Sequence, residues 1–214
     1  MKHLAILGAS GHGRVIADTA ECCDWDRISF FDDAWPHRTD NGSWQVVGTS
    51  DDLLNSLKDF DGIVVGIGSN AIRQNKQSQI AAAGGMLATV IHPSAVVSRY
   101  STIGRGSVVF AGAIVNAGAR IGNGVILNTG CTIDHDCVLG DFSHISPGAN
   151  LAGTVQIGRR SWVGIGACIR HMIHIGDDVI VGAGAAVVNN IDNELTVAGV
   201  PARPIKNTNR QDKA

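Results

Sequence analysis

The sequence predicts two regions of different architecture: an α/β domain with a small parallel sheet over residues 1–90, and a parallel β-helix over residues 91–204. In the first region, short apolar segments alternate with amphipathic ones, which is the order of strands and helices in a parallel α/β sheet. From residue 91 an aliphatic side chain recurs at every sixth position, with a small residue two positions before it. Such a hexapeptide repeat is typical of a parallel β-helix. Residues 205–214 are expected to form a polar tail.

The elements of the first region follow from its apolar periodicity. Residues 4–7 are a short apolar run that ends in a glycine turn, so we expect a buried strand there. Strands are also expected at residues 28–31 and 62–67, and helices at residues 14–23, 51–57 and 70–83, with Ser50 as the N-cap of the second helix. Residues 35–47 are polar and predict an irregular connection.

The first strand is followed by the turn Gly-Ala-Ser-Gly-His-Gly at residues 8–13, which leads into a helix. In a Rossmann-like α/β domain such a turn presents backbone amides to phosphate, although Ser10 breaks the strict G-x-G-x-x-G pattern. Asp32 ends the second strand, where a carboxylate can bind a ribose hydroxyl or a base edge. Residues 66–73 open the same cleft after the third strand. Taken alone, this arrangement is also compatible with NAD.

The β-helix rests on sixteen consecutive aliphatic residues at six-residue spacing, from Val97 to Val187. Three repeats form a coil of 18 residues, in which each aliphatic side chain points into a prism and the small residue lies at a tight corner. Cys131 and Cys137 occupy the small positions, which favours corner packing over a nucleophilic role. A glycine also recurs once per coil and is expected to give one corner its backbone freedom, at Gly104, Gly122, Gly140, Gly158 and Gly176.

The composition argues against several classes of protein. Seventeen basic and 19 acidic residues leave a net charge of −2, which does not favour a nucleic-acid or membrane-surface partner. No apolar run reaches the roughly 18 residues that span a bilayer, and residues 1–7 lead into a glycine turn rather than forming a signal peptide. Five cysteines in no disulfide-like spacing favour a reducing cytoplasm.

One histidine departs from the repeat at an outward-facing corner. The 18-residue period stacks His135 with Gly153 and His171 in successive coils. A base beside a free backbone amide suits acyl transfer, because the base deprotonates the nucleophile and the amide binds the developing oxyanion. Either Asp134 or Asp136 can orient the imidazole. The alternative is a solvated histidine on a turn.

His135 and His171 also raise the possibility of a metal site. The prism-shaped carbonic anhydrases use three histidines from adjacent coils of neighbouring chains. Their pattern places the third histidine five positions after the second, where this sequence has Gly176, and His174 is only three positions on. A catalytic metal is therefore not expected.

The repeat in this register resembles that of the left-handed parallel β-helix acyltransferases, as does the ending Ala-Gly-Val-Pro-Ala-Arg at residues 198–203. The resemblance implies a left-handed β-helix and a homotrimer that binds its acyl donor between neighbouring prisms. Nearly the whole chain, about residues 2–204, is similar to the PglD/NeuD-like sugar O- and N-acetyltransferases. Residues 8–13, 31–33, 66–73 and 133–153 carry that similarity.

This resemblance implies roles for individual residues. His135 matches the family's general base, and Asp136 matches the acidic residue that increases its basicity. Acetyl-CoA contacts are implied for His144, Gly153, Ile165 and Ala183, and nucleotide-sugar contacts for Ser10, Gly11, His12, Asp32 and Asp33. The cleft adds Gly68 and Asn70 as substrate contacts, although Asn70 can equally be a helix N-cap and Arg73 a solvated helix residue. Arg159 and Arg160 either contact a CoA phosphate or only solvate a turn.

The sequence therefore predicts a cytoplasmic, metal-free N-acetyltransferase of bacterial surface-glycan biosynthesis. It would transfer the acetyl group of acetyl-CoA directly to the 4-amino group of a UDP- or dTDP-linked amino-deoxy sugar. Three alternatives remain open: O-acetylation of sialic acid or another sugar, a metal-dependent β-helix enzyme of the carbonic anhydrase type, and a trimeric scaffold without catalysis.

Overall fold

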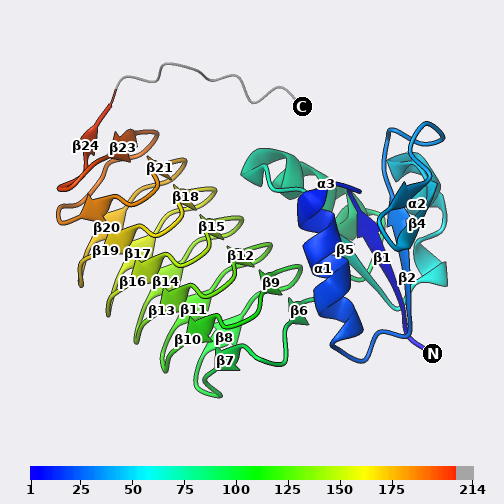
Figure 1. Ribbon diagram of the computed structural model, residues 1–214, viewed down its shortest axis with the longest axis horizontal. Helices are drawn as coiled ribbons and strands as arrows, with labels where there is room; N and C mark the ends of the chain where they lie inside the picture. The colour runs from blue at the N-terminus through cyan, green and yellow to red at the C-terminus, as the bar shows by residue number, and fades with distance from the viewer. Residues whose placement is uncertain (206–214) are drawn as a thin grey trace.

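The computed structural model describes residues 1–205, so the predicted polar tail lies outside the described residues except for Ile205. An α/β domain stands beside a three-sided prism of stacked coils (Figure 1). No helix among residues 1–205 is both long and apolar enough to cross a membrane.

The α/β domain is built on a five-stranded sheet in the order β3-β4-β2-β1-β5. Its strands are β1 (His3–Leu7), β2 (Arg27–Phe31), β3 (Asp40–Asn41), β4 (Trp44–Gly48) and β5 (Gly62–Val65), and only the β3–β4 pair is antiparallel. The helical elements are α1 (Gly11–Glu21), α2 (Ser50–Asn55), the 3-10 turn η1 (Leu57–Asp59) and α3 (Asn70–Ala82). Strand β1 lies inside the sheet, between β2 and β5, and is covered on both faces, which is why residues 4–7 are continuously apolar.

Two features of this domain differ from the sequence predictions. The connection at residues 35–47 contains most of β4, which pairs with β2 and alternates buried Val46 with exposed Val47. Polar neighbours concealed this strand, because a strand with one covered face needs an apolar side chain only at every second position. Helix α2 begins at Ser50 because Thr49 is its N-cap, in a capping box with Asp52.

The chain then winds into three parallel sheets, which we call faces 1, 2 and 3. Face 1 contains β6 (Val90–Ile91), β9 (Val108–Val109), β12 (Ile126–Leu127), β15 (His144–Ile145), β18 (Trp162–Val163), β21 (Ile180–Val181) and β23 (Thr196–Ala198), with β24 (Arg203–Pro204) antiparallel at its end. Face 2 contains β7 (Val96–Val97), β10 (Ile114–Val115), β13 (Thr132–Ile133), β16 (Asn150–Leu151), β19 (Cys168–Ile169) and β22 (Ala186–Val187). Face 3 contains β8 (Thr102–Ile103), β11 (Arg120–Ile121), β14 (Val138–Leu139), β17 (Gln156–Ile157) and β20 (His174–Ile175). The chain runs from face 1 to face 2 to face 3 and back to face 1, and each corner is named by the two faces that it joins. The corner 2–3, for example, follows a strand of face 2 and precedes a strand of face 3.

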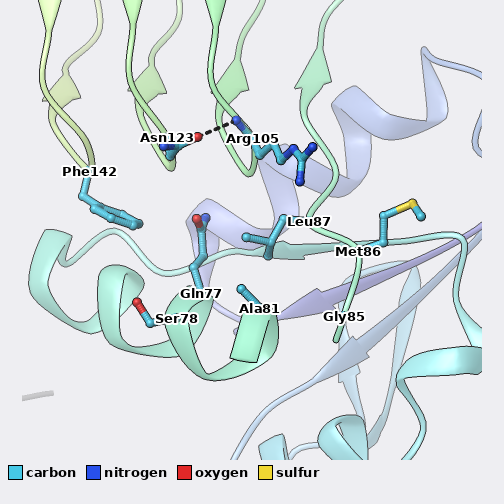
Figure 2. A pocket seen from close by; sticks show the side chains of 9 residues that line it. All are labelled: Gln77, Ser78, Ala81, Gly85, Met86, Leu87, Arg105, Asn123 and Phe142. Atoms are coloured by element: carbon cyan, nitrogen blue, oxygen red, sulfur yellow. Dashed lines mark hydrogen bonds between the residues drawn. The ribbon is translucent and has the colours of Figure 1, made fainter. Parts of the chain in front are cut away.

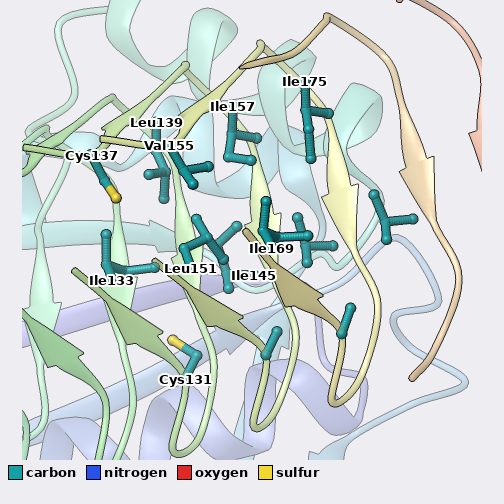
Figure 3. Close-up of a cluster of buried hydrophobic side chains, with 14 of the residues drawn as sticks. Cys131, Ile133, Cys137, Leu139, Ile145, Leu151, Val155, Ile157, Ile169 and Ile175 are labelled. Carbon is teal, nitrogen blue, oxygen red and sulfur yellow. The ribbon is translucent and has the colours of Figure 1, made fainter. Parts of the chain in front are cut away.

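From β6 to β22, neighbouring strands of each face are offset by 18 residues, which confirms the predicted coil; the last parallel pair, β21 and β23, is offset by 16. Thr132 pairs with Ile114 on one side and with Asn150 on the other, for example. The predicted aliphatic series fills the interior, and Cys131 and Cys137 are buried among it (Figure 3). The prism thus has a packed apolar interior, and residues 18 positions apart lie one above the other at each corner.

The corners use glycine for two different reasons. The expectation that Gly104 and its once-per-coil counterparts need backbone freedom is wrong, because none of these five glycines has a positive φ. A Cβ on any of them would instead press on the next coil. The left-handed conformation recurs in another six-residue series, from Gly106 to Gly184, in which eight positions are glycine. The other six are Asp136, Phe142, Thr154, Arg160, Met172 and Asp178.

The α/β domain covers part of face 1 and the corner 3–1. Apolar side chains of α1 pack against Val108 and Ile126, which point outward from face 1. Asn70, Arg73 and Gln77 of helix α3 are spaced by three and four positions, so they lie on one face of the helix. This polar face contacts the corner 3–1. Gln77 donates to the carbonyl of Gly106, and Asn70 and Arg73 make further contacts described below.

Candidate active site

His135 lies at the corner 2–3, directly after β13, and its side chain is 60% exposed. Its Nδ1 lies 2.9 Å from Oδ2 of Asp136. This hydrogen bond, assisted by the negative charges of Asp134 and Asp136, raises the pKa of His135 above its ordinary value. Because Nδ1–H donates to Asp136, the neutral imidazole keeps its basic lone pair on Nε2.

The two acidic residues beside His135 have different roles. Asp136 adopts a left-handed conformation with a φ of 58° and contacts the ring. Asp134 instead accepts hydrogen bonds from the backbone N–H of His135 and from the Asn116 side chain, so it orders the turn. Of the two alternatives left open by the sequence, the geometry therefore favours Asp136 as the partner of the base.

Gly153 lies one coil beyond His135 at the same corner. The N–H of Thr154 donates to the carbonyl of His135, and the N–H of Met172 donates to that of Gly153, so the corner stacks as the period predicts. A Cβ at position 153 would overlap Nε2 of His135. The Gly153 N–H has no hydrogen-bond partner among residues 1–205. The ring nitrogen of His135 therefore lies next to a residue whose amide donor is unpaired among the described residues.

The other histidines of this part of the prism do not gather around His135. His171 lies one coil beyond Gly153, which separates it from His135, and His174 starts β20 on face 3. Among the described residues, no group of three or more His, Cys, Asp and Glu side chains is arranged to hold a metal ion.

A second histidine cluster lies between the two domains. His144 in β15 is 6% exposed, stacks on Trp162 with ring centroids 4.5 Å apart, and lies 6.4 Å from the ring of His12 in α1. Burial, reinforced by the positive charge of Arg73, lowers the pKa of His12 to about 4 and that of His144 to about 3. Both rings are therefore neutral at pH 7. A predicted nucleotide-sugar contact and a predicted acetyl-CoA contact thus meet at one place.

Asn128 determines the tautomer of His144. The Asn128 Oδ1 accepts from the N–H of Thr129, so its Nδ2 donates to Nε2 of His144, 3.2 Å away. Neutral His144 then carries its proton on Nδ1, which is buried and has no partner among the described residues. A buried donor without an acceptor is costly, so this N–H is an unsatisfied hydrogen-bond donor at the edge of face 1. Asn128 was not singled out in the sequence, since its role depends on a contact 16 positions away.

Ile165 and Ala183 lie on the corner 1–2, one coil apart, and both are exposed. The neighbouring left-handed positions of this corner are Gly148, Gly166 and Gly184, and a Cβ on any of them would meet nothing within 4 Å. The corner beside His144 is therefore lined by small residues and one exposed isoleucine, which leaves a smooth surface along the prism.

A cleft of about 530 Å³ opens at the carboxyl ends of β1, β2 and β5. Four of the predicted nucleotide-sugar contacts line it, namely Ser10, Asp32, Asp33 and Gly68, whereas Gly11 and His12 follow Ser10 in the first turn of α1. This is the edge of a parallel sheet at which α/β proteins bind their ligands. The structure thus brings the predicted cleft residues together.

The glycines around this cleft fall into two groups. Gly8, Gly13 and Gly66 are required by packing, since a Cβ on Gly13 would overlap the carbonyl of Gly8 and one on Gly66 would press on Gly13. A Cβ on Gly11 or Gly68 would meet nothing within 4 Å. Because glycine in a helix costs about 1 kcal/mol relative to alanine, its use at position 11 points to a need for open surface rather than for packing.

The two acidic residues of the cleft are held by protein groups. Asp32 accepts from the N–H of Ala9 at 2.7 Å, which ties the glycine turn to the end of β2. Asp33 accepts from the hydroxyl and the N–H of Ser50 and lies 3.4 Å from the ammonium of Lys76. These contacts, the Ser50 hydroxyl first, lower the pKa of Asp33.

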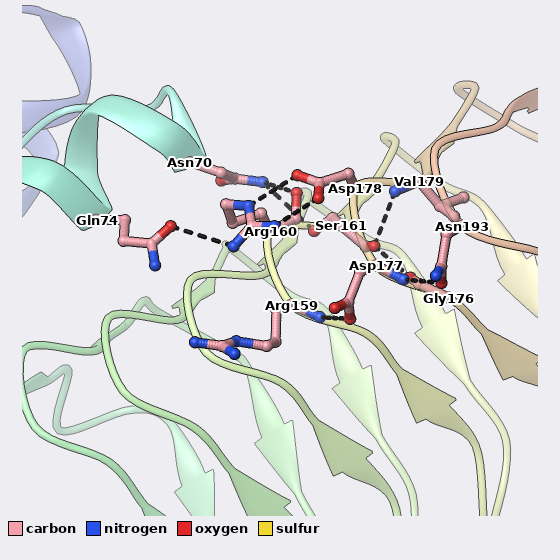
Figure 4. Close-up of polar contacts among 10 residues, drawn as sticks. All are labelled: Asn70, Gln74, Arg159, Arg160, Ser161, Gly176, Asp177, Asp178, Val179 and Asn193. Carbon is pink, nitrogen blue, oxygen red and sulfur yellow. Dashed lines mark hydrogen bonds and ion pairs between the residues drawn. The ribbon is translucent and has the colours of Figure 1, made fainter.

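The structure places Asn70 in the domain interface rather than in the cleft. Its Nδ2 donates to the carbonyl of Arg160 at 2.7 Å, and its Oδ1 accepts from Arg73. Arg160 pairs with Asp178 and donates to Gln74 of α3, so this arginine also serves the interface (Figure 4). Arg73 is only 1% exposed, so the alternative of a solvated helix residue is wrong.

The chain is similar to several known proteins. The sequence profile of the PglD N-terminal domain matches residues 3–80. The acetyltransferase domain of PglB from Neisseria gonorrhoeae FA1090 is 44% identical, with a TM-score of 0.91 over 96% of this chain and 100% of that chain. This chain belongs to the PglD-like sugar acetyltransferases. The predicted fold class, a Rossmann-like domain followed by a left-handed parallel β-helix, is confirmed.

Two further relatives of this sugar acetyltransferase have named substrates. A histidine-to-asparagine mutant of perosamine N-acetyltransferase from Caulobacter crescentus, in complex with CoA and GDP-perosamine, is 37% identical, with a TM-score of 0.90 over 96% of this chain and 97% of that chain. The UDP-N-acetylbacillosamine N-acetyltransferase of Bacillus subtilis (strain 168) is 35% identical over 111 residues, 50% of this chain. That match spans about half of the curated relative, 51% of its length.

Within one chain of the acetyltransferase, the functional groups lie in two places. The cleft, His12 and His144 lie together at the α/β domain and face 1, and Ile165 and Ala183 continue along the corner 1–2. His135 and Gly153 lie at the corner 2–3, with face 2 in between. His135 and the cleft therefore lie at separate places within one chain.

A second, larger cavity of about 600 Å³ lies between α3 and the corner 3–1 (Figure 2). Phe142 and Leu87 form apolar walls, and Arg105 lies at its rim on the prism side. None of the predicted site residues of the acetyltransferase lines it.

Proposed function

We propose that this chain transfers the acetyl group of acetyl-CoA directly to the 4-amino group of a nucleotide-linked amino-deoxy sugar, in bacterial surface-glycan biosynthesis. The observation that carries the proposal is that His135 Nε2 lies next to the Cα of Gly153, a residue whose N–H has no hydrogen-bond partner among the described residues. Family membership and the CoA and nucleotide-sugar complexes of the perosamine enzyme support the choice of substrates.

In the proposed reaction, Nε2 of His135 takes a proton from the amine as its nitrogen bonds to the thioester carbonyl carbon. The Gly153 N–H donates to the carbonyl oxygen as that oxygen becomes negative. The carbon–sulfur bond then breaks, and the His135 imidazolium returns the proton to the departing thiolate. Asp136 orients the ring and stabilises the imidazolium between these two steps.

Acetyl-CoA fits the smooth surface of the corner 1–2. The buried Nδ1–H of His144 needs an acceptor, and an amide or thioester carbonyl supplies one. Ile165 and Ala183 would contact the extended arm of the donor, where small corner residues allow close approach. Neutral His144 serves as a hydrogen-bond donor here and not as a second base.

The cleft of the α/β domain would hold the nucleotide diphosphate. Ser10, Gly11 and Gly68 leave backbone surface open to phosphate, and Asp32 and Asp33 stand where a ribose or base is recognised. Among UDP, dTDP and GDP we favour UDP or dTDP. His12 would face the sugar, because its ring lies between the first turn of α1 and His144.

We further propose a homotrimer in which His135 of one chain acts on substrates held by the cleft and His144 of its neighbour. The separation of these groups within one chain supports this arrangement. Mixing His135→Ala with Gly68→Trp chains tests it, because position 68 is open toward the cleft. In a random equal mixture about one quarter of shared sites receive both intact parts, since each part is intact with a chance of one half. Sites formed within one chain would show no recovery.

The decisive experiment is an acetyl-transfer assay with a panel of UDP-, dTDP- and GDP-linked 4-amino sugars, with CoA thiol release as the readout. One member of the panel should be acetylated on nitrogen, with mass spectrometry locating the new amide. Sialic acid and other hydroxyl-only sugars serve as the comparison set. Acetylation of these instead, or activity only after metal addition, would contradict the proposal.

A further inference from the structure

Arg73 is the largest fully buried side chain of the described residues and joins three segments of the chain. Its Nε donates to the carbonyl of Gly124, and one terminal nitrogen donates to Phe142 O and Asn70 Oδ1. The other terminal nitrogen donates to the carbonyls of Ile67 at 3.2 Å and Gly68 at 3.0 Å. One guanidinium therefore holds both the corner 3–1 of the prism and the loop at residues 66–69, which we call the cleft loop.

None of these acceptors is a carboxylate. Burying a cation without an opposite charge costs free energy of folding. A neutral side chain would link the two domains at a lower cost. Only the planar fork of arginine, with five N–H donors, reaches acceptors on both domains at once. Its use suggests that the direction of the cleft-loop carbonyls matters to function.

The two carbonyls held by Arg73 define where two N–H groups point. In a trans peptide the C=O and N–H bonds point in opposite directions, and neither peptide here is cis. With the carbonyls of Ile67 and Gly68 turned toward Arg73, the N–H groups of Gly68 and Ser69 turn away from it. Both residues line the cleft, and neither N–H has a hydrogen-bond partner among residues 1–205.

We propose that Arg73 is a positioning residue that holds the Gly68 and Ser69 N–H groups toward the diphosphate of the bound nucleotide sugar. The inference rests on the proposed function and adds the residue that organises this side of the cleft.

The charged side chains of the cleft are paired with one another, so they do not by themselves account for the binding of a diphosphate. Two carboxylates, Asp32 and Asp33, are matched by two cations, Arg38 and Lys76, and each acid lies within 3.5 Å of one cation. These side chains therefore largely neutralise one another. Backbone N–H groups polarised by a buried guanidinium supply the remaining attraction for a diphosphate.

Replacing Ser69 by proline tests the N–H group without removing Arg73. Ser69 has a φ of −61°, which a proline ring adopts, and its hydroxyl makes no capping hydrogen bond. Ser69→Pro removes the N–H and the hydroxyl and adds a ring carbon on the nitrogen, and Ser69→Ala, which deletes the hydroxyl alone, is the matched reference. Calorimetric titration with UDP, dTDP and GDP should show that Ser69→Pro binds the preferred diphosphate about tenfold more weakly than Ser69→Ala. Acetyl-CoA affinity should differ less than twofold between them.

The arginine itself is tested by Arg73→Lys, which keeps the charge but loses the fork. We expect KM for the nucleotide sugar to rise at least tenfold while KM for acetyl-CoA stays within twofold, in protein whose melting curve remains cooperative. Equal affinity of Ser69→Pro and Ser69→Ala, or a parallel rise of both KM values in Arg73→Lys, overturns the positioning role. If none of the three diphosphates binds the unmodified chain, the proposed function fails and this inference fails with it.

Discussion

The corner 2–3 and the domain interface each hold histidines, and the two regions treat that side chain in opposite ways. At the corner, His135 is 60% exposed, and a hydrogen bond to Asp136 raises its pKa. In the interface, His12 and His144 lose most of their contact with water, which lowers their pKa values to about 4 and about 3. One residue type thus gives a ring with a raised pKa at the corner and two rings in the interface that are neutral at pH 7.

This difference shows that environment, rather than residue type, assigns the roles. A general base needs a carboxylate partner and an exposed ring, and the corner gives His135 both, in line with the proposed role. A ring that donates one hydrogen bond to a carbonyl must not titrate, and burial between two domains ensures this. The predictions below test the contrast, starting from the largest expected effect.

Removing the corner base should have the largest effect. His135→Ala is expected to reduce kcat about 1000-fold, because general-base catalysis contributes about 10²–10⁴-fold. The KM for acetyl-CoA should change little, since the proposed donor contacts lie on another corner. Steady-state kinetics with CoA thiol detection measures both values. Retention of more than a few per cent of the turnover would remove His135 from the mechanism.

Gly153→Ala should lower kcat about 100-fold, by displacing the ring and crowding the unpaired amide. The backbone of residue 153 is not in the left-handed region, so the folded state should tolerate alanine. The double variant with His135→Ala provides the control. If the two residues form one unit, the double variant will be about as slow as His135→Ala alone. Additive losses would show that Gly153 acts independently of the base.

The sequence could predict the corner well because its geometry is periodic. An 18-residue coil stacks His135 on Gly153 without any tertiary information, and Asp136 is adjacent in the chain. The period could not reveal which glycines are left-handed, since close packing between coils and a positive φ both select glycine.

The interface was predicted less well because its contacts join distant segments. Asn70 reaches a carbonyl 90 positions away, and Arg73 reaches one 69 positions away. No local pattern marks such partners, so Asn70 was assigned to the substrate, and a solvated helix residue remained an open alternative for Arg73. The gathering of the predicted cleft residues needed less information, because the sheet topology alone brings those strand ends together.

Asp136→Asn should bring the pKa of His135 closer to the ordinary value of a histidine. The Asp136 hydrogen bond raises the pKa of His135, so its loss should move the ascending limb of the kcat/KM–pH profile to lower pH. The plateau should fall about tenfold, because a weaker base and a less ordered ring remain. Profiles from pH 5 to 9 measure both changes, and Asp134→Asn is the matched control. A larger shift in the control would assign the supporting role to Asp134.

The smallest effect concerns stability and has opposite signs in the two regions. His12 and His144 have lowered pKa values in the folded state, so the unfolded chain binds more protons below pH 6.5 and stability falls as the pH decreases. At pH 5 the loss is about 2 kcal/mol for each ring, from 1.36 kcal/mol per pH unit below 6.5. The raised pKa of exposed His135 acts in the other direction, because its stabilisation is present at low pH and is lost as the pH rises through that pKa.

Urea titrations at pH 7 and pH 5 measure this term as a difference between variants. His144→Gln should lose less stability than the unmodified chain between these two pH values, because one buried group no longer needs to stay unprotonated. His135→Gln is the matched control from the corner, and its loss between pH 7 and pH 5 should be equal to or slightly larger than that of the unmodified chain. If the two glutamine variants respond alike, the buried rings titrate as exposed ones do, and the contrast between the two regions does not hold.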